Sequence, residues 1–156
     1  MSATARSWAL AGILCAVVVA GDQAVKAVVE AQLVLGEEVD GLGPIGITLS
    51  HNRGVAFGLA GGAGIGLVLL TVVALAVIGW LFARDPARRG MWIAVGLLSG
   101  GALGNLIDRL ASGAVTDYIE IGPWPPFNLA DVAITTGVLL MVWIYLRDAE
   151  SGADSG

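Results

Sequence analysis

The segment between Gly54 and Ala83 constrains the fold most, because it contains no charged residue and no proline. A helix that crosses the hydrocarbon core of a bilayer needs about 20 consecutive, mostly apolar residues, and this segment is longer than that. Its second part, GLVLLTVVALAVIGWLFA, is strongly apolar. The segment therefore predicts a transmembrane helix, which we place at residues 59–83.

Three other apolar segments have the same character. The chain is 56% hydrophobic and only 13% charged, which is too apolar for an ordinary soluble domain. Gly90 to Ile107 carries no charge, and Phe127 to Leu146 carries only Asp131. We therefore expect an all-α integral membrane protein whose four transmembrane helices lie at residues 8–29, 59–83, 90–109 and 128–146.

The first apolar segment has an alternative interpretation. Residues 8–21 are uncharged, follow a basic residue and include the small-residue pattern Val18 to Ala20, which is also typical of a cleavable secretory signal. The apolar character continues past Asp22 and Lys26 in AVKAVVEAQLVL. We therefore favour a membrane span.

The basic residues predict the orientation, because loops on the cytoplasmic side carry an excess of lysine and arginine. Five of the eight basic residues flank the termini or lie in the short loop RDPARRG: Arg6, Arg84, Arg88, Arg89 and Arg147. We expect both termini, the loop 84–89 and the tail 148–156 to be cytoplasmic. Residues 31–58 and 110–127 are then outside.

The outer segments and the tail differ in composition. QLVLGEEVDGLGPIGITLS has several glycines between short apolar runs, which predicts short strands outside the membrane. Residues 110–127 are expected as an outer loop that contains Asp117 and ends in a proline-rich turn, with Trp124 as an interfacial anchor. The tail from Asp148 reads as disordered.

Polar side chains gather at the outer ends of the predicted helices. Asp22 and Lys26 lie one turn apart at the end of the first helix, and Asn128 and Asp131 begin the fourth. Others expected at this depth are Asn52, Arg53, Asn105, Asp108, Arg109 and Asp117. Each costs a few kcal/mol in hydrocarbon unless it is paired or hydrated, so we expect a site here. The alternative is that these groups pair at the interface, Asp22 with Lys26 and Asp108 with Arg109, or that Lys26 and Arg53 extend to the surface.

Two patterns of glycine predict close helix packing. Gly96, Gly100 and Gly104 recur every four residues along the third helix. Gly58, Gly62 and Gly66 have the same spacing at the start of the second. Small residues at this interval let helix backbones approach one another in a membrane.

Carboxylate chemistry fits the available side chains best. His51 is the only histidine and Cys15 the only cysteine, so we expect no metal site and no cofactor. No serine lies in a context that indicates a nucleophile with an oxyanion hole. Two aspartates held close together cannot both ionise, so one keeps a proton while the other activates water. The net charge of -5 would argue against a nucleic-acid partner in a soluble chain, but in a membrane protein the placement of charges says more than their sum; we expect no nucleic-acid partner.

Five segments resemble, in order, the sequence boxes of the lipoprotein signal peptidase (signal peptidase II) family. They are DQAVK at Asp22, HNRGVAFG at His51, GGALGNLIDR at Gly100, VTDYIEI at Val115 and FNLADVAI at Phe127. The resemblance implies that Asp117 and Asp131 are the catalytic pair. It assigns substrate-binding or supporting roles to Asn52, Gly54, Asn105, Asp108, Arg109, Asn128, Asp22 and Lys26.

The same resemblance implies an activity and a location. The enzyme would remove signal peptides from diacylglyceryl-modified prolipoproteins, cutting on the amino side of the lipidated cysteine. It would be a monomer in the bacterial cytoplasmic membrane, in contact with membrane lipid, with its active site near the outer leaflet. A small outer sheet would cradle the substrate, together with a mobile helical segment.

Two other functions stay open on the sequence alone. In an ion-coupled or proton-coupled transporter, Asp22, Asp108 and Asp131 would bind the ion. Transporters usually place such groups near the bilayer midplane in repeated halves, whereas no internal repeat is visible here. A non-catalytic membrane protein that binds lipidated proteins is the other alternative.

Overall fold

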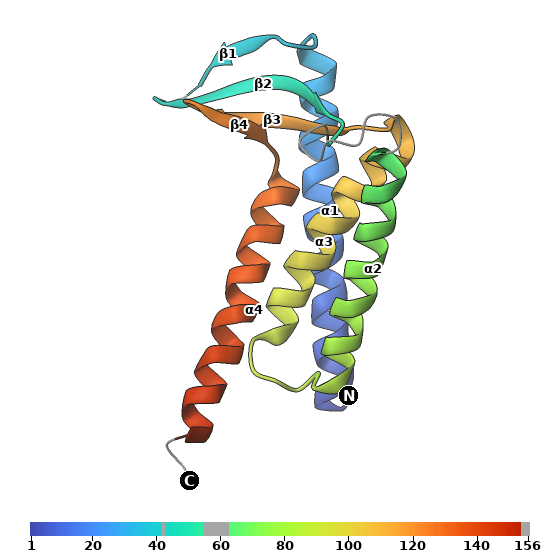
Figure 1. The fold of residues 1–156 in the computed structure, drawn as a ribbon, viewed down its shortest axis with the longest axis vertical. Helices are drawn as coiled ribbons and strands as arrows, with labels where there is room; N and C mark the ends of the chain where they lie inside the picture. Colours follow the sequence, from blue (N-terminus) through green and yellow to red (C-terminus); the bar gives the residue numbers. More distant parts are fainter. Residues whose placement is uncertain (42, 55–62, 154–156) are drawn as a thin grey trace.

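The computed structural model describes residues 1–41, 43–54 and 63–153, with side chains up to Glu150. Within these residues, four helices are long and apolar enough to cross a membrane. They are α1 (Ala3–Gln32), α2 (Ala63–Arg84), α3 (Met91–Ser112) and α4 (Leu129–Ala153), which run roughly alongside one another in Figure 1. The predicted fold of four transmembrane helices with a small outer sheet is confirmed.

A small antiparallel sheet lies at one end of the helices, and both termini lie at the other (Figure 1). Its strands are β1 (Glu38–Asp40), β2 (Ile45–Asn52), β3 (Val115–Ile121) and β4 (Trp124–Phe127), in that order. The predicted short strands between residues 31 and 52 are confirmed by β1 and β2.

The second outer segment differs from its expected loop. Residues 115–121 form β3, so Asp117 lies on a strand, paired with Ser50 of β2. VTDYIEI is rich in β-branched and aromatic residues, which fit a strand, although its acidic residues gave it the character of a loop. The proline-rich residues form the edge strand β4, where a missing backbone donor is tolerated.

The glycines of α3 pack this helix against α1, as predicted. A Cβ atom at Gly96 would lie 2.9 Å from Leu14 Cβ, and one at Gly100 would lie 2.7 Å from Val18 Cβ. On α2 the prediction is wrong for Gly66, because none of the described residues of another element lies within 4 Å of a Cβ atom placed there. Gly58 and Gly62 lie outside the described residues.

Two helix ends lie furthest beyond their predicted positions, by five residues at the start of α1 and by seven at the end of α4. α1 begins at Ala3 because Ser2 caps it, with Ser2 Oγ accepting a hydrogen bond from Ala5 N at 3.2 Å. α4 continues to Ala153, so the predicted disorder from Asp148 onward is wrong for residues 148–153. No proline interrupts this stretch, and within it Asp148 forms an ion pair with the preceding Arg147.

α3 is the central helix of the bundle. It packs most extensively against α1 and α4. More than half of its apolar segment is buried, a larger share than in any of the other three helices. Those three helices expose many large apolar residues. Leu69, Leu70 and Leu139 are examples of such exposed side chains. A helix surface of this kind suits contact with lipid.

Candidate active site

Asp117 and Asp131 meet where β3 passes over the start of α4. Asn128 lies between them and is completely buried. Its Nδ2 donates a hydrogen bond to Asp117 Oδ1 at 2.7 Å. Its backbone N donates to Asp131 Oδ2 at 3.2 Å, and Asp131 N donates in return to Asn128 Oδ1 at 2.9 Å. This reciprocal cap fixes the first turn of α4 and places Asp131 beside Asp117.

A second amide, Asn105 of α3, also contacts the pair. Its Nδ2 donates a hydrogen bond to Asp131 Oδ1 at 2.8 Å. Its Oδ1 accepts hydrogen bonds from Lys26 Nζ and from Asn128 Nδ2, each at 3.1 Å. The two carboxyl groups are therefore held by two buried amides from different helices.

The surroundings of Asp117 favour its protonated form. Burial, and secondly the negative charge of Asp131, raise the pKa of Asp117 to about 6. Hydrogen bonds from Asn52 and Asn128, together with the charge of Lys26, oppose this shift without cancelling it. A carboxyl group with a pKa of about 6 beside a second carboxyl group can hold a proton under mildly acidic to near-neutral conditions.

A buried cluster of three charged residues, Asp22, Lys26 and Asp108, is linked to the pair through Asn105. Lys26 Nζ lies 2.7 Å from an oxygen of Asp22 and 2.7 Å from an oxygen of Asp108, and only 3% of Lys26 is exposed. The interpretation that Lys26 extends to the surface is therefore wrong, because its ammonium group is buried among acceptors. Asp108 pairs with Lys26 and not with Arg109.

This cluster also holds the sheet and α4 in place. Asp108 Oδ2 accepts a hydrogen bond from Thr116 N, the residue before Asp117, at 3.2 Å. Asp22 Oδ1 accepts one from Ala130 N, the residue before Asp131, at 3.0 Å. Each aspartate of the cluster thus fixes the backbone next to one member of the central pair.

Three other predicted site residues surround the pair. Asn52 ends β2 and contacts Asp117 through a side-chain hydrogen bond. Asn52 Oδ1 also accepts from Gly54 N at 2.9 Å, and Gly54 has φ +72°, a conformation that glycine adopts readily. A Cβ atom at Gly54 would collide with Leu67 Cδ1. Arg109 is half-buried, and its Nη1 donates to the backbone oxygen of Asn105 at 3.3 Å.

Cavities reach Asp131 from two sides. One of about 410 Å³ lies between α2, α3 and α4 and is lined by Asn105, Arg109 and Asp131 at its polar end, with apolar residues such as Leu70, Ile78 and Val138 elsewhere. Another, of about 300 Å³, is lined by Trp124, Phe127, Asp131, Val132, Thr135 and Thr136. Asp131 is therefore accessible from two largely apolar cavities at the level of the helices.

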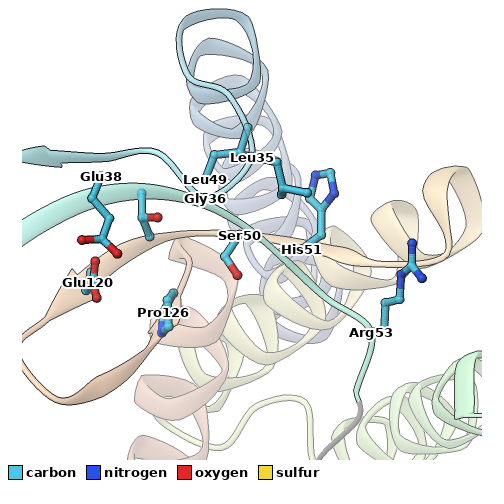
Figure 2. Close-up of a pocket in the computed structure, with 10 residues that line it drawn as sticks. Leu35, Gly36, Glu38, Leu49, Ser50, His51, Arg53, Glu120 and Pro126 are labelled. Atoms are coloured by element: carbon cyan, nitrogen blue, oxygen red, sulfur yellow. The ribbon is translucent and has the colours of Figure 1, made fainter. Parts of the chain in front are cut away.

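A third pocket lies on the sheet. It has a volume of about 440 Å³ and includes Ser50, the strand neighbour of Asp117 (Figure 2). Glu38 of β1 and Glu120 of β3 line the same pocket, and both side chains are visible there in Figure 2. The pocket extends from the strands next to the central pair toward the outer edge of the sheet.

Several contacts involve residues that sequence reasoning missed. Gln23 Nε2 donates to Asp108 Oδ1 at 2.8 Å, and Tyr118 Oη accepts from Leu129 N at 3.1 Å. Thr116 Oγ1 donates to Glu30 Oε1 at 2.6 Å. Gln23 and Tyr118 lie inside the sequence boxes, but only the fold brings them to their partners. Within the described residues, no group of three histidine, cysteine or acidic side chains is arranged to hold a metal ion.

Comparisons with known proteins identify the family of this chain. The sequence model of the family described as signal peptidase (SPase) II matches residues 14–147. The chain belongs to the signal peptidase II family. It is 40% identical over 143 residues to the lipoprotein signal peptidase of Pelotomaculum thermopropionicum, covering 90% of this chain and 94% of that protein. It is also 33% identical over 149 residues to the lipoprotein signal peptidase of Staphylococcus aureus, covering 91% of each chain.

Solved structures extend the family likeness to the fold. A bacterial membrane enzyme determined by the in meso method at 1.9 Å resolution is 31% identical and superposes with a TM-score of 0.83, covering 88% of this chain and 93% of that chain. A second structure of this kind, at 2.3 Å, gives the same TM-score. As a member of the signal peptidase II family, the chain is a multi-pass membrane protease.

Proposed function

We propose that this protein is an aspartic endopeptidase that removes signal peptides from diacylglyceryl-modified prolipoproteins, cutting on the amino side of the lipidated cysteine. The observation that carries the proposal is the joint attachment of Asp117 and Asp131 to the buried amide of Asn128. The family supports a protease that processes lipoproteins. The carboxyl pair supplies the chemistry.

The two carboxyl groups take different parts in this mechanism. Burial and the charge of Asp131 raise the pKa of Asp117 to about 6, so we place the shared proton on Asp117. Asp131 accepts a proton from water as the water attacks the peptide carbonyl carbon. Asp117 donates its proton to the carbonyl oxygen as the tetrahedral intermediate forms. Asp131 then gives the proton that it took from water to the amine nitrogen, the carbon–nitrogen bond breaks, and Asp117 takes a proton back from the intermediate as the new carboxyl group forms.

The cavities fit a substrate that has apolar parts, the acyl chains and the signal peptide, and a polar part, the chain that follows the cysteine. The 410 Å³ cavity between α2, α3 and α4 and the 300 Å³ cavity beside Trp124 both reach Asp131 at helix level, where acyl chains and a signal peptide lie in a bilayer. The pocket over the sheet would accept the chain that follows the cysteine. The bilayer itself would hold the cleavage site at the depth of the carboxyl pair.

The charge distribution supports a cytoplasmic location for both termini and an outer location for the site. Arg84, Arg88 and Arg147 lie at the end of the bundle opposite the sheet, where each contacts an aromatic ring. Basic residues favour the cytoplasmic side. We therefore place the sheet and the carboxyl pair at the outer leaflet of the bacterial cytoplasmic membrane, in a monomeric enzyme. Because the polar groups gather at one end of the helices, we favour this function over ion transport.

The substrate class is tested by lipid dependence. The wild-type protein in detergent micelles is given a diacylglyceryl-modified prolipoprotein and the same protein with its cysteine replaced by serine. We expect cleavage of the lipidated form to be faster by about 100-fold or more, because binding of the lipid arms positions the peptide bond. Mass spectrometry should find cysteine at the new amino terminus. Equal cleavage of both substrates, or a cut elsewhere, would contradict the proposal.

The pH dependence follows from the raised pKa of Asp117. Below a pH of about 6 Asp117 carries the proton that the mechanism needs, and above it the proton is progressively lost. We expect kcat/KM to fall on the alkaline side with a midpoint near pH 6. The corresponding midpoint in kcat should lie higher, because bound substrate excludes further water. The rates are measured from pH 5 to pH 9 on protein that remains monodisperse; a kcat/KM that rises through this range would show that Asp117 acts without its proton.

A further inference from the structure

Lys26 makes a complete set of hydrogen bonds without reaching the carboxyl pair. Its ammonium group has three protons and no acceptor. It has three acceptors: Asp22 Oδ2 and Asp108 Oδ2, each at 2.7 Å, and Asn105 Oδ1 at 3.1 Å. Because the side chain is buried, these three contacts account for its donors, and none is left for a substrate.

The ammonium group is one of two donors that fix how the Asn105 amide is turned; the other is Asn128 Nδ2, and each donates to Asn105 Oδ1 at 3.1 Å. Only the amide oxygen can face a group that donates and cannot accept. With Oδ1 turned toward Lys26, the amide nitrogen of Asn105 points toward Asp131, to which it donates at 2.8 Å. The opposite orientation would place two donors against each other at Lys26 and two acceptors against each other at Asp131.

The Asn128 amide is also oriented by a donor that faces its oxygen, in this case a backbone N–H in the first turn of α4. The backbone N–H of Asp131 donates to Asn128 Oδ1, so Nδ2 is directed toward Asp117 Oδ1 and Asn105 Oδ1. The two amides thus form one connected chain of hydrogen bonds that ends on both carboxyl groups. Lys26 is the charged donor at the other end of that chain.

We propose that Lys26 is a positioning residue for the cleavage reaction: it orients the Asn105 amide, and through it the hydrogen bonds that hold Asp131 beside Asp117. This inference rests on the proposed function of the carboxyl pair and adds a role for a residue that touches neither substrate nor the reacting carboxyl groups. The charges near Lys26 are Asp22 on its own helix and Asp108 on α3, with Asp117 on β3 and Asp131 on α4 beyond the amides.

The test must separate the lost hydrogen bond from the lost charge. Removing Lys26 alone would leave Asp22 and Asp108 buried without a cation, which is strongly destabilising. The double variant Lys26→Met with Asp108→Asn removes one positive and one negative charge and leaves Asp22 as the one carboxylate of this cluster, which still accepts the hydrogen bond from Ala130 N. It has the same charge as the glutamine double variant below, so a difference in kcat between these two variants isolates the hydrogen bond. Its matched control is Asp108→Asn alone, in which Lys26 can still bind Asn105. A second variant, Lys26→Gln with Asp108→Asn, restores N–H donors at position 26.

The measurement is kcat and KM on the lipidated prolipoprotein, on the monodisperse fraction of each protein. We expect the methionine double variant to have a kcat roughly 10- to 100-fold below that of Asp108→Asn with a similar KM, because a misplaced catalytic group slows the chemical step. The glutamine double variant should recover part of this loss. A purely structural role would reduce the folded fraction and leave the kcat of the remaining folded protein unchanged.

The outcomes distinguish the two proposals. If the wild type cleaves and both double variants have the kcat of Asp108→Asn, the role of Lys26 is wrong and the proposed function stands. If the methionine double variant does not fold, Asp22→Asn is added to both double variants, so that no carboxylate of this cluster is left without a cation. Equal kcat values for the methionine and glutamine forms, which differ only in the N–H donors at position 26, would then overturn the inference. If the folded wild type does not cleave, the proposed function itself is wrong.

Discussion

Replacement of either Asp117 or Asp131 with asparagine is expected to lower the rate of prolipoprotein cleavage by about 10²- to 10⁴-fold, the range typical for loss of a general acid or base. The change keeps the shape of the side chain. At position 131, the amide oxygen of asparagine can still accept the hydrogen bond that Asn105 donates in the wild type. At position 117, asparagine can neither donate an acidic proton nor take one up. The loss should therefore be in kcat, with the protein still folded.

An aspartate far from the site provides the matched control. Asp85 lies at the opposite end of the bundle, is exposed and pairs with Arg88 at 3.2 Å. Asp85→Asn should leave both the rate and the elution profile unchanged, because an exposed ion pair contributes little. Cleavage is followed by gel shift at equal amounts of monodisperse protein. Substantial activity in either Asp117→Asn or Asp131→Asn would remove that residue from the catalytic pair.

Asn128→Ala is expected to have the second-largest effect, because Asn128 has both a structural and a chemical role. It caps α4 and donates to Asp117, so its loss leaves Asp131 N and Asp117 Oδ1 without their partner. Loss of the cap and of a buried hydrogen bond together should destabilise the fold by about 2–4 kcal/mol. Cleavage by the protein that remains folded should fall by about 100-fold or more, since both carboxyl groups lose a positioning contact.

Ser2→Ala separates the structural role from the chemical one. Ser2 caps α1 at the other end of the bundle through its bond to Ala5 N. Its removal should cost about 1 kcal/mol of stability or less and leave kcat unchanged. Thermal unfolding in detergent and the cleavage assay are measured on both variants. An Asn128→Ala protein that loses only as much stability as Ser2→Ala and retains its kcat would contradict the role given to Asn128.

The sequence was sufficient to predict the membrane-spanning part of the fold and the side chains that the helices carry. A long uncharged segment allows few structures other than a spanning helix, as α2 shows. Because residues three or four apart lie about one helical turn from each other, the pairs Asp22 with Lys26 and Asn128 with Asp131 could be placed at their helix ends in advance. The every-fourth glycines of α3 likewise indicated a close approach of two helices, which the contacts with α1 confirm.

The contacts between elements could not be predicted in this way. Asp117 reaches its position through the pairing of β3 with β2, which joins segments that are far apart in the chain. The burial of Lys26 depends on Asp108 and Asn105 arriving from α3. Gly66 follows the same spacing as the α3 glycines but has no helix against it. Local patterns determine which face a residue occupies, whereas its partner is determined by tertiary packing.

The most direct test of the carboxyl-pair mechanism is the intact mass of the products formed from a diacylglyceryl-modified prolipoprotein by the wild type and by Asp131→Asn, each folded and at equal amounts. The mechanism predicts that the wild type releases the signal peptide and leaves a lipidated cysteine as the new amino terminus, while Asp131→Asn leaves the substrate at its full mass. The same products from the Asp131→Asn protein would contradict it.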